Sequence, residues 1–332
     1  MAGKTVPREC GAVVNLLLTG AFGNIGSHVL AELLRRKHEV RCLAARTPAD
    51  ERRAARFVSV TDVRWVDIRD AGAVADAVAG VEVVLHFAAL IPPASDDDPE
   101  YARQVNVEGT ANVIAACRAQ SKSPRLIFAS TFDVHGRTLD KPPPRHVEDP
   151  LRATDAYSRH KIEGEALVRR SGLTWFIPRF ADVPIIGVRK AEPIMFEIGL
   201  DNRIEVLHPA DAALAMANAL ETELVWGTTM FIGGGTSCQV TYRQFVAGVL
   251  RAMGLRMLPE SAFSDKTYAT DWLDTEASQR MLWYQRCDFD TITADIAATL
   301  GWKRHLMPLS RPFAERAMLR LSPYYAEAAG GS

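Results

Sequence analysis

The chain has 332 residues, 48% of them hydrophobic, and its 39 basic and 40 acidic residues leave a formal charge of −1. This length and apolar content suit one large domain or two closely associated ones. A charge near zero gives no field that attracts nucleic acid or anionic lipid, so we expect a small-molecule substrate and no nucleic-acid partner.

Cysteine use and hydropathy indicate the class of protein. The cysteines are odd in number and show no Cys-x-x-Cys spacing, so we expect reduced thiols and neither a disulfide framework nor a metal site. They are Cys10, Cys42, Cys117, Cys238 and Cys287. There is no run of 18 apolar residues and no apolar signal segment near the N-terminus. We therefore expect a soluble, cytoplasmic protein without an integral membrane segment.

Apolar runs alternate with helical periodicity in the first half of the chain. The runs predict strands buried on both faces at 13–18, 39–44, 63–66, 81–88, 125–130 and 173–179. Between them, period 3.6 predicts helices at 24–36, 71–80, 99–119 and 156–172. Repeated βα units predict an α/β fold with a Rossmann-type, doubly wound parallel sheet, whose ligands lie at the carboxyl ends of the strands.

The rhythm changes after Arg179. A helix is predicted at 209–221, a strand at 228–233, a turn-rich loop at 141–150 and a helical region from about Thr241 onward. We predict a dinucleotide-binding domain over 12–182, to which 207–233 return. A smaller, mostly C-terminal substrate-binding region would comprise 183–206 and 234–332.

Three glycines follow the first predicted strand. Gly20, Gly23 and Gly26 stand in Thr-Gly-x-x-Gly-x-x-Gly spacing and open a helix. The first serves a tight turn, the second lets a pyrophosphate approach the backbone, and the third lets the helix pack on the strand. A purely structural turn is the alternative, but the strand, the glycines and the helix together favour a dinucleotide.

The end of the second strand bears on the choice between NAD and NADP. The acidic residue that usually binds the ribose diol is expected about 20 residues after the glycines, where Ala44, Ala45 and Arg46 stand instead. Arg46 could meet a 2′-phosphate, which favours NADP, or be a solvated loop arginine. Asp67 could accept a hydrogen bond from adenine or cap the next helix.

Tyr157 and Lys161 are four residues apart and should share one helix face. A nearby ammonium favours the phenolate of a tyrosine, whose pKa is ordinarily about 10, and so suits it for general acid–base chemistry. Ser130 and Thr131, at the end of the fifth strand, could hold a reacting oxygen, although such hydroxyls also bond loop amides.

These residues resemble the extended short-chain dehydrogenase/reductase family over nearly the whole chain. The motifs that carry the resemblance are LLLTGAFGNIGSHV, VDIRD, VVLHFAAL, VNVEGTANVIAAC, FASTFDVHG, AYSRHK, HPADAALA and WLDTEASQRML. The resemblance implies that Tyr157 is the acid/base, that Lys161 bonds the nicotinamide ribose and lowers the tyrosine pKa, and that Thr131, with Ser130 before it, orients the substrate oxygen. It also implies a homodimer. The residue patterns above and the resemblance together give the predicted cofactor-binding residues, which are Gly20, Phe22, Gly23, Asn24, Ile25, Gly26, Arg46, Asp67, Ile68, Ala88, Asn106, Tyr157, Lys161 and Pro178.

The chain departs from the family at positions that bear on substrate. Phe132 stands where dTDP-glucose dehydratases have an aspartate, and a phenyl ring cannot protonate a leaving hydroxyl. Asp182 replaces an asparagine that helps epimerases to bind a nucleotide diphosphate, which it would repel. His135 replaces the usual tyrosine and is either a pocket donor or, more in keeping with most histidines, structural.

We therefore expect hydride transfer between NADP or NAD and a secondary alcohol or ketone. The alternatives are an epimerase that retains NAD and a dinucleotide sensor without chemistry. Phe313, Ala317 and Leu321 form one apolar row of a C-terminal helix with arginines nearby. Packing against the protein or a second subunit is favoured for this row over contact with a membrane surface.

Overall fold

A mostly parallel sheet runs through the chain. The computed structural model describes residues 13–188, 191–302 and 307–325. The strands are β1 (Asn15–Thr19), β2 (Glu39–Ala44), β3 (Asp62–Trp65), β4 (Val83–His86), β5 (Arg125–Phe128), β6 (Ser130–Thr131), β7 (Trp175–Phe180), β8 (Arg203–Glu205), β9 (Thr228–Ile232) and β10 (Gln239–Thr241). The large sheet has the order β3-β2-β1-β4-β5-β7-β6, and β9 also pairs with β7. The predicted Rossmann-type α/β class is confirmed.

The chain forms two compact units. The first contains the residues up to Ala129 together with Glu163–Ile177 and Ala213–Thr228, and the second contains Ser130–Ile162, Pro178–Ala212 and the residues from Thr229 onward. These units are defined by compactness, whereas the domains predicted from the sequence are defined by the ligand that each would bind. The predicted domain boundaries therefore stay a prediction.

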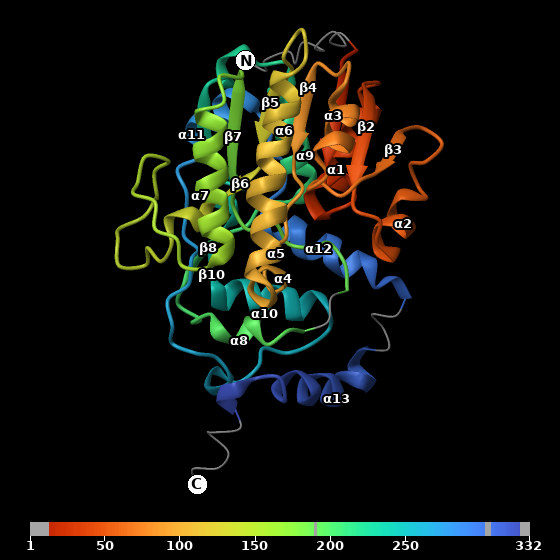
Figure 1. The fold of residues 1–332 in the computed structure, drawn as a ribbon. Helices are drawn as coiled ribbons and strands as arrows, with labels where there is room; N and C mark the ends of the chain where they lie inside the picture. Colours follow the sequence, from red (N-terminus) through yellow and green to blue (C-terminus); the bar gives the residue numbers. More distant parts are fainter. Residues whose placement is uncertain (1–12, 189–190, 303–306, 326–332) are drawn as a thin grey trace, which may run out of the picture. The chain divides into compact units, whose positions relative to one another are not determined.

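Helices of the first unit cover the sheet strands. They are α1 (Asn24–Arg35), α2 (Pro48–Ala54), α3 (Ala71–Val78), α4 (Ala94–Asp97), α5 (Pro99–Arg103), the π-helix η1 (Gln104–Glu108), α6 (Gly109–Arg118) and the short 3₁₀ turn η3 (Glu223–Val225). Figure 1 shows α3 and α6 on one face of the strands, where Val74 and Val113 join a single buried cluster with Leu17 and Val84. Burial of these aliphatic side chains holds the βα units together.

The second unit has its own apolar core. Its helices and turns are η2 (Phe132–His135), α8 (Ile194–Glu197), η4 (Thr236–Cys238), α10 (Tyr242–Ala252), η5 (Glu260–Ala262), α11 (Glu276–Leu282), α12 (Phe289–Thr299) and α13 (Met307–Leu319), while α7 (Ala156–Arg169) and α9 (Pro209–Leu220) contribute residues to both units. Phe196, Val246, Ile292 and Met318 meet in this core. Thr241 begins α10 with a capping box to Gln244, in agreement with the predicted start of the helical region.

Three expectations are corrected. Strand β3 is not buried on both faces, because it lies at the edge of the sheet and exposes Asp62 and Arg64. The stretch predicted as one helix at 99–119 is α5, η1 and α6 in succession, with a π-helical turn between two α-helices. A helix absent from the prediction, α2, begins at Pro48 with Thr47 as its N-cap.

The C-terminal helix packs through a different face from the one predicted. Ala314 and Met318 of α13 join the second core, whereas Phe313 is 79% exposed and Leu321 is 38% exposed. Ala317 is exposed as well. The row Phe313–Ala317–Leu321 therefore does not pack against the described part of this chain.

No helix among the described residues is both long and apolar enough to cross a membrane. Four of the five cysteines, Cys42, Cys117, Cys238 and Cys287, are free thiols in the structure. Cys10 lies outside the described residues.

Candidate active site

The three glycines form a tight turn between β1 and α1. Gly20 has a φ of +66°, and a Cβ atom added there would lie 2.7 Å from the backbone nitrogen of Ala88. A Cβ on Gly26 would lie 2.2 Å from the Gly20 carbonyl oxygen. The Gly23 amide closes the turn by donating to that same carbonyl at 3.0 Å. Only glycine fits at positions 20 and 26, as expected of a turn that brings backbone close to a phosphate.

The N-terminus of α1 is suited to an anion. Gly23 is its N-cap, and no side chain among the described residues caps it. The first amide donors of α1 and the positive end of its dipole lie at this N-terminus, directly after the glycine turn. Asn24 and Ile25, which follow, are half-buried, and Phe22 is buried. These features fit the pyrophosphate of a dinucleotide.

An aromatic and basic surface adjoins the glycine turn. Phe22 packs against Trp65 with ring centroids 5.8 Å apart, and the guanidinium of Arg46 lies 5.8 Å from the Trp65 ring centroid. Arg46 is exposed and pairs with Glu51 at 3.1 Å. Arg53 of α2 donates to the Phe22 carbonyl at 3.3 Å, so a second arginine adjoins the turn. Sequence reasoning did not single out Arg53, because α2 was not predicted.

Asp67 and Ile68 follow β3. Asp67 is exposed, and the guanidinium of Arg69, which hydrogen-bonds its carboxylate, lowers the pKa of Asp67. The alternative interpretation of Asp67 as a helix cap is wrong, because Asp70 caps α3 by accepting from the Ala73 amide. Ile68 is buried close to Gly109, where a Cβ would lie 2.6 Å from the isoleucine Cγ2.

A buried hydrogen-bond chain fixes the end of β4. The Thr19 hydroxyl accepts from the Phe87 and Ala88 amides at 3.1 Å each and lies 2.7 Å from Nδ1 of His86. Nε2 of His86 lies 2.9 Å from the Thr110 hydroxyl. The turn against which Gly20 packs is therefore held by side chains from β1, β4 and α6. Only the buried histidine in the apolar stretch VVLHFAAL hinted at this network in the sequence.

Asn106 lies in the π-helical turn and holds the loop after β4. Its Oδ1 accepts from the Leu90 amide at 2.7 Å and its Nδ2 donates to the Leu90 carbonyl at 2.9 Å. The side chain is 4% exposed, and both ends of its amide are used in this way. Its observed task is to position the chain that follows Ala88. Direct contact with a cofactor stays a prediction.

Pro178 lies inside β7, where that strand changes partner. Trp175 and Phe176 pair with β5, whereas Arg179 and Phe180 pair with β6. A proline has no amide to donate, so the interval between two partner strands tolerates it. Pro178 is buried at this point of the sheet.

The second unit contains the candidate catalytic side chains. Ser130 and Thr131 form β6, and Tyr157 and Lys161 lie one turn apart on α7. The ammonium of Lys161 lies 5.7 Å from the ring centroid of Tyr157, so the predicted shared face is confirmed. Ser130 and Lys161 are each 4% exposed, whereas Thr131 and Tyr157 are half-buried.

Burial and two nearby acidic groups set the protonation of Tyr157. Burial, followed by the charges of Asp133 and Asp155, raises the pKa of Tyr157 above its usual range. The sequence led us to expect a lowered pKa from Lys161. The difference arises because burial and two carboxylates both disfavour the phenolate. In the protein without cofactor or substrate, Tyr157 is therefore a protonated phenol.

Asp133 follows Phe132 in the motif FASTFDVHG. It is half-buried, its amide donates to the Thr131 hydroxyl at 3.2 Å, and its carboxyl also hydrogen-bonds that hydroxyl. Burial, reinforced by the charges of Asp182 and Asp155, raises the pKa of Asp133 to about 8. A carboxylic acid that keeps its proton near neutrality is therefore bonded to the candidate substrate-orienting hydroxyl.

A second acid, Asp182, follows β7. The residue as a whole is exposed to solvent. Burial of its carboxyl raises the pKa of Asp182 to about 6. The Thr270 hydroxyl donates to it at 2.9 Å and opposes that rise. His135 is buried, stacks on Phe132 at 5.4 Å and accepts from Arg179 at 2.9 Å. These contacts support its structural interpretation.

A family model named "NAD dependent epimerase/dehydratase family" matches residues 16–183. The chain belongs to this family. It is a family of NAD- or NADP-dependent enzymes, and the matched segment contains the glycine turn, Thr131, Tyr157 and Lys161. Within the described residues, no group of three or more His, Cys, Asp or Glu side chains could hold a metal ion.

Curated relatives match over part of their length. An L-arabinose 1-dehydrogenase (NAD(P)(+)) of Haloferax volcanii is 34% identical over 47% of this chain and 60% of its own length. The human 3 beta-hydroxysteroid dehydrogenase type 7 is 37% identical over 36% of this chain and 33% of its own. The chain thus spans three-fifths or less of the length of these two relatives.

Solved structures match over more of the chain. A dTDP-glucose 4,6-dehydratase of Streptomyces venezuelae, with NAD bound, has a TM-score of 0.73 at 25% identity and covers 89% of this chain and 99% of its own. A UDP-glucose-4-epimerase of Stenotrophomonas maltophila has a TM-score of 0.72 at 21% identity, and the match covers 90% of this chain and 99% of the epimerase. The latter similarity concerns the fold alone.

Proposed function

We propose that the protein is an NAD(P)-dependent oxidoreductase that interconverts a secondary alcohol and a ketone. The observation that carries the proposal is the pair on α7, in which the Lys161 ammonium lies 5.7 Å from the Tyr157 ring centroid. The first unit would bind the dinucleotide through Gly20, Gly23 and the N-terminus of α1. When bound, the nicotinamide supplies or accepts the hydride.

Tyr157 acts as the general acid during reduction. Its phenol holds a proton, which it gives to the substrate oxygen as the carbonyl becomes a hydroxyl, and the reverse transfer accompanies oxidation. The nearby positive charge of Lys161 stabilises the resulting phenolate. Thr131 orients the same oxygen by hydrogen bonding, so the carbonyl is held in a reactive geometry. Ser130 supports this end of β6.

The cofactor we favour is NADP. Ala44 and Ala45 supply no carboxylate for a ribose diol, whereas Arg46 and Arg53 place two cations around the aromatic pair beside the glycine turn. A 2′-phosphate would replace the ion pair of Arg46 with Glu51, which is solvent-exposed on both sides and therefore weak.

Phe132, Asp133 and Asp182 restrict the substrate. Phe132 is buried and has no proton to give, which disfavours a dehydration of the dTDP-glucose type. Asp182 is exposed and carries negative charge above a pH of about 6, so an anionic nucleotide sugar would be repelled. We infer a neutral alcohol or ketone as substrate.

Replacement of Tyr157 by phenylalanine tests the assignment. The Tyr157→Phe variant is expected to lose about 10²–10⁴-fold in kcat, since a positioned acid contributes that much. NADPH oxidation against a panel of ketones and aldoses measures the loss, and Tyr325→Phe, outside the candidate site, serves as control. Unchanged turnover in Tyr157→Phe would remove Tyr157 from the mechanism. An altered sugar without net NADPH consumption would indicate an epimerase instead.

A further inference from the structure

The second unit contains a cavity that none of the candidate catalytic residues lines. Its volume is about 660 Å³, and it is open to solvent. Its walls are the loop with Pro143 and Pro144, strand β10, the segment from Leu273 to Glu276, and the end of α11 with Trp283. Small-molecule sites usually measure about 300–1,000 Å³.

Trp283 follows α11 in a conformation that side chains rarely adopt. Its φ of 50° and ψ of 52° are left-handed, a region that favours glycine at the end of a helix. The Trp283 amide donates to the Gln279 carbonyl at 2.8 Å, and the Gln279 side chain accepts from the Tyr284 and Gln285 amides at 3.0 Å each. The surroundings thus hold a strained tryptophan, which is a reason to look for a function.

The indole forms one wall of the cavity. Trp283 is 57% exposed although the guanidinium of Arg286 lies 5.5 Å from its ring centroid. Arg286 does not line the cavity, whereas Trp283 does, so the exposed indole contributes aromatic surface to it. Pro143, Pro144 and Leu273 complete its apolar lining. A flat aromatic face beside aliphatic rings suits a ligand with an apolar C–H face.

The rim of the cavity is polar and carries little net charge. Asp274, Glu276 and Arg280 contribute two carboxylates and one guanidinium, and Gln239 and Gln279 contribute amides. Glu276 pairs with Arg280 at 3.4 Å, which leaves Asp274 beside His146 at 3.2 Å. Such a rim offers hydrogen bonds to hydroxyl groups and no cationic cluster for a phosphate.

Other ligand classes fit less well. Recognition of an ammonium group uses a cage of several aromatic rings, and recognition of a proline-rich peptide uses an aromatic groove. Among the cavity's lining residues, Trp283 is the only aromatic side chain. A ring with an apolar face and hydroxyl groups at its edge can stack on the indole and hydrogen-bond the polar side chains of the rim.

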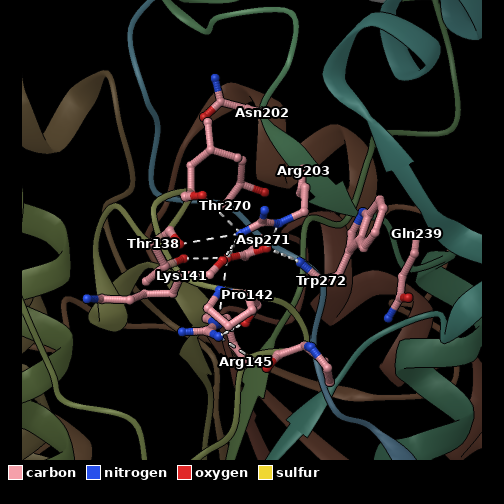
Figure 2. Close-up of polar contacts among 12 residues, drawn as sticks. Thr138, Lys141, Pro142, Arg145, Asn202, Arg203, Gln239, Thr270, Asp271 and Trp272 are labelled. Atoms are coloured by element: carbon pink, nitrogen blue, oxygen red, sulfur yellow. Dashed lines mark hydrogen bonds and ion pairs between the residues drawn. The ribbon is translucent and has the colours of Figure 1, made fainter.

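A buried ion cluster fixes the proline wall. Asp271 accepts from Arg203 at 2.5 and 3.0 Å and from the Thr138 hydroxyl at 2.7 Å. Arg203 also donates to the Lys141 carbonyl at 2.7 Å, and Arg145 donates to the Pro142 carbonyl. Figure 2 shows these side chains converging on Asp271. A wall held in this way needs no ordering when a ligand binds.

We propose that this cavity is a binding site for a neutral carbohydrate, whose sugar ring stacks on Trp283 while its hydroxyl groups bond the amides and Asp274. The site is independent of the proposed hydride transfer. It requires neither cofactor nor turnover.

Cellobiose binding to the full chain tests the proposal by saturation-transfer NMR and calorimetry. We expect saturable binding with a Kd on the order of 1 mM. Trp283→Gly removes the indole and adopts the left-handed backbone without strain, so it should keep or raise the unfolding temperature while losing the binding. Trp302→Leu removes another exposed tryptophan, 69% exposed and outside the cavity lining, and should bind as the unchanged chain does.

A second variant guards against indirect effects. Asp274→Asn keeps the shape of the rim and should weaken cellobiose binding by about 3–10-fold, because the amide replaces a charged acceptor by a neutral one that still forms a hydrogen bond. Binding retained in Trp283→Gly, or absent from the unchanged chain, would overturn the proposal. So would preferential binding of hexaproline or inorganic phosphate at this cavity.

Discussion

At the scale of single residues, spacing was enough to identify the glycines but not the acids. Gly20, Gly23 and Gly26 belong to one short turn between a strand and a helix. Their spacing is visible within seven neighbouring residues, so the sequence alone predicts the turn. Asp133 and Asp182 are 49 positions apart. Burial raises the pKa of both, and the charge of Asp182 raises that of Asp133 further. No local pattern contains that information.

Asp133 should impose a pH dependence on carbonyl reduction. Below its pKa of about 8 the side chain is neutral, and above it the new charge further disfavours the Tyr157 phenolate. A weaker acid donates its proton more slowly, so reduction should slow as the pH rises through about 8. Other charged groups near the phenol are Asp155 and Lys161, and Asp182 acts on Asp133. In Asp133→Asn the inflection near pH 8 should vanish from a profile of kcat/KM against pH.

The same group affects stability with a defined sign. Its pKa is raised on folding, so between about pH 4 and 8 the folded chain retains a proton that the unfolded chain has lost, and stability falls as the pH rises. Asp133→Asn should therefore be more stable than the unchanged chain at pH 8, by about 1–2 kcal/mol once solvent screening of a half-buried group is considered. Equal stability at pH 5 and 8 in the unchanged chain would contradict the raised pKa.

At the scale of elements, long periodic segments were predictable and short ones were not. Helix α1 was found almost residue for residue, since its apolar positions repeat with the helical period. Helix α2 has 7 residues and buries only Ala54, so it shows no such period. Thr47 with Asp50 and Pro48 marked its start, a capping signal that periodicity ignores. The π-helical turn η1 left no mark of its own in the sequence.

Helix α2 makes the cofactor preference testable. Glu51 neutralises Arg46 by an exposed ion pair, so Glu51→Gln should release that arginine and tighten NADPH binding about 2–5-fold, the range expected for such pairs. NADH affinity should change little, which makes it the internal control. Fluorescence titration of both reduced cofactors measures the ratio. If NADH binding tightens equally, Arg46 does not distinguish the two cofactors.

At the scale of the whole molecule, composition predicted the class of ligand and could not predict how the chain divides. Each unit buries its own cluster of apolar side chains, and the second unit is assembled from three separate stretches of sequence. Which distant stretches share a core depends on long-range packing, which periodicity does not record. The cavity beside Trp283 was missed for the same reason, because its walls come from segments more than a hundred residues apart.

Cofactor binding should stabilise the folded chain through the glycine turn. At 100 times its Kd, a ligand that binds only the folded state adds about 2.7 kcal/mol, visible as a rise in Tm. Gly26→Ala should abolish this rise, because its Cβ would lie 2.2 Å from the Gly20 carbonyl oxygen. Gly72→Ala, whose Cβ would make an ordinary contact at 3.5 Å, should preserve it. Equal shifts in both variants would show that the dinucleotide binds elsewhere.

The hydrogen bond between Thr138 and Asp271 joins residues 133 positions apart. On the ribosome, the proline-rich segment emerges long before the aspartate that anchors it has been translated. Until then Arg145 and Arg203 lack their shared counter-ion, and at about 5–20 residues per second this delay lasts on the order of 10 seconds. A nascent chain halted before residue 271 should accordingly leave that segment open to protease, and a chain extended well past it should protect the segment.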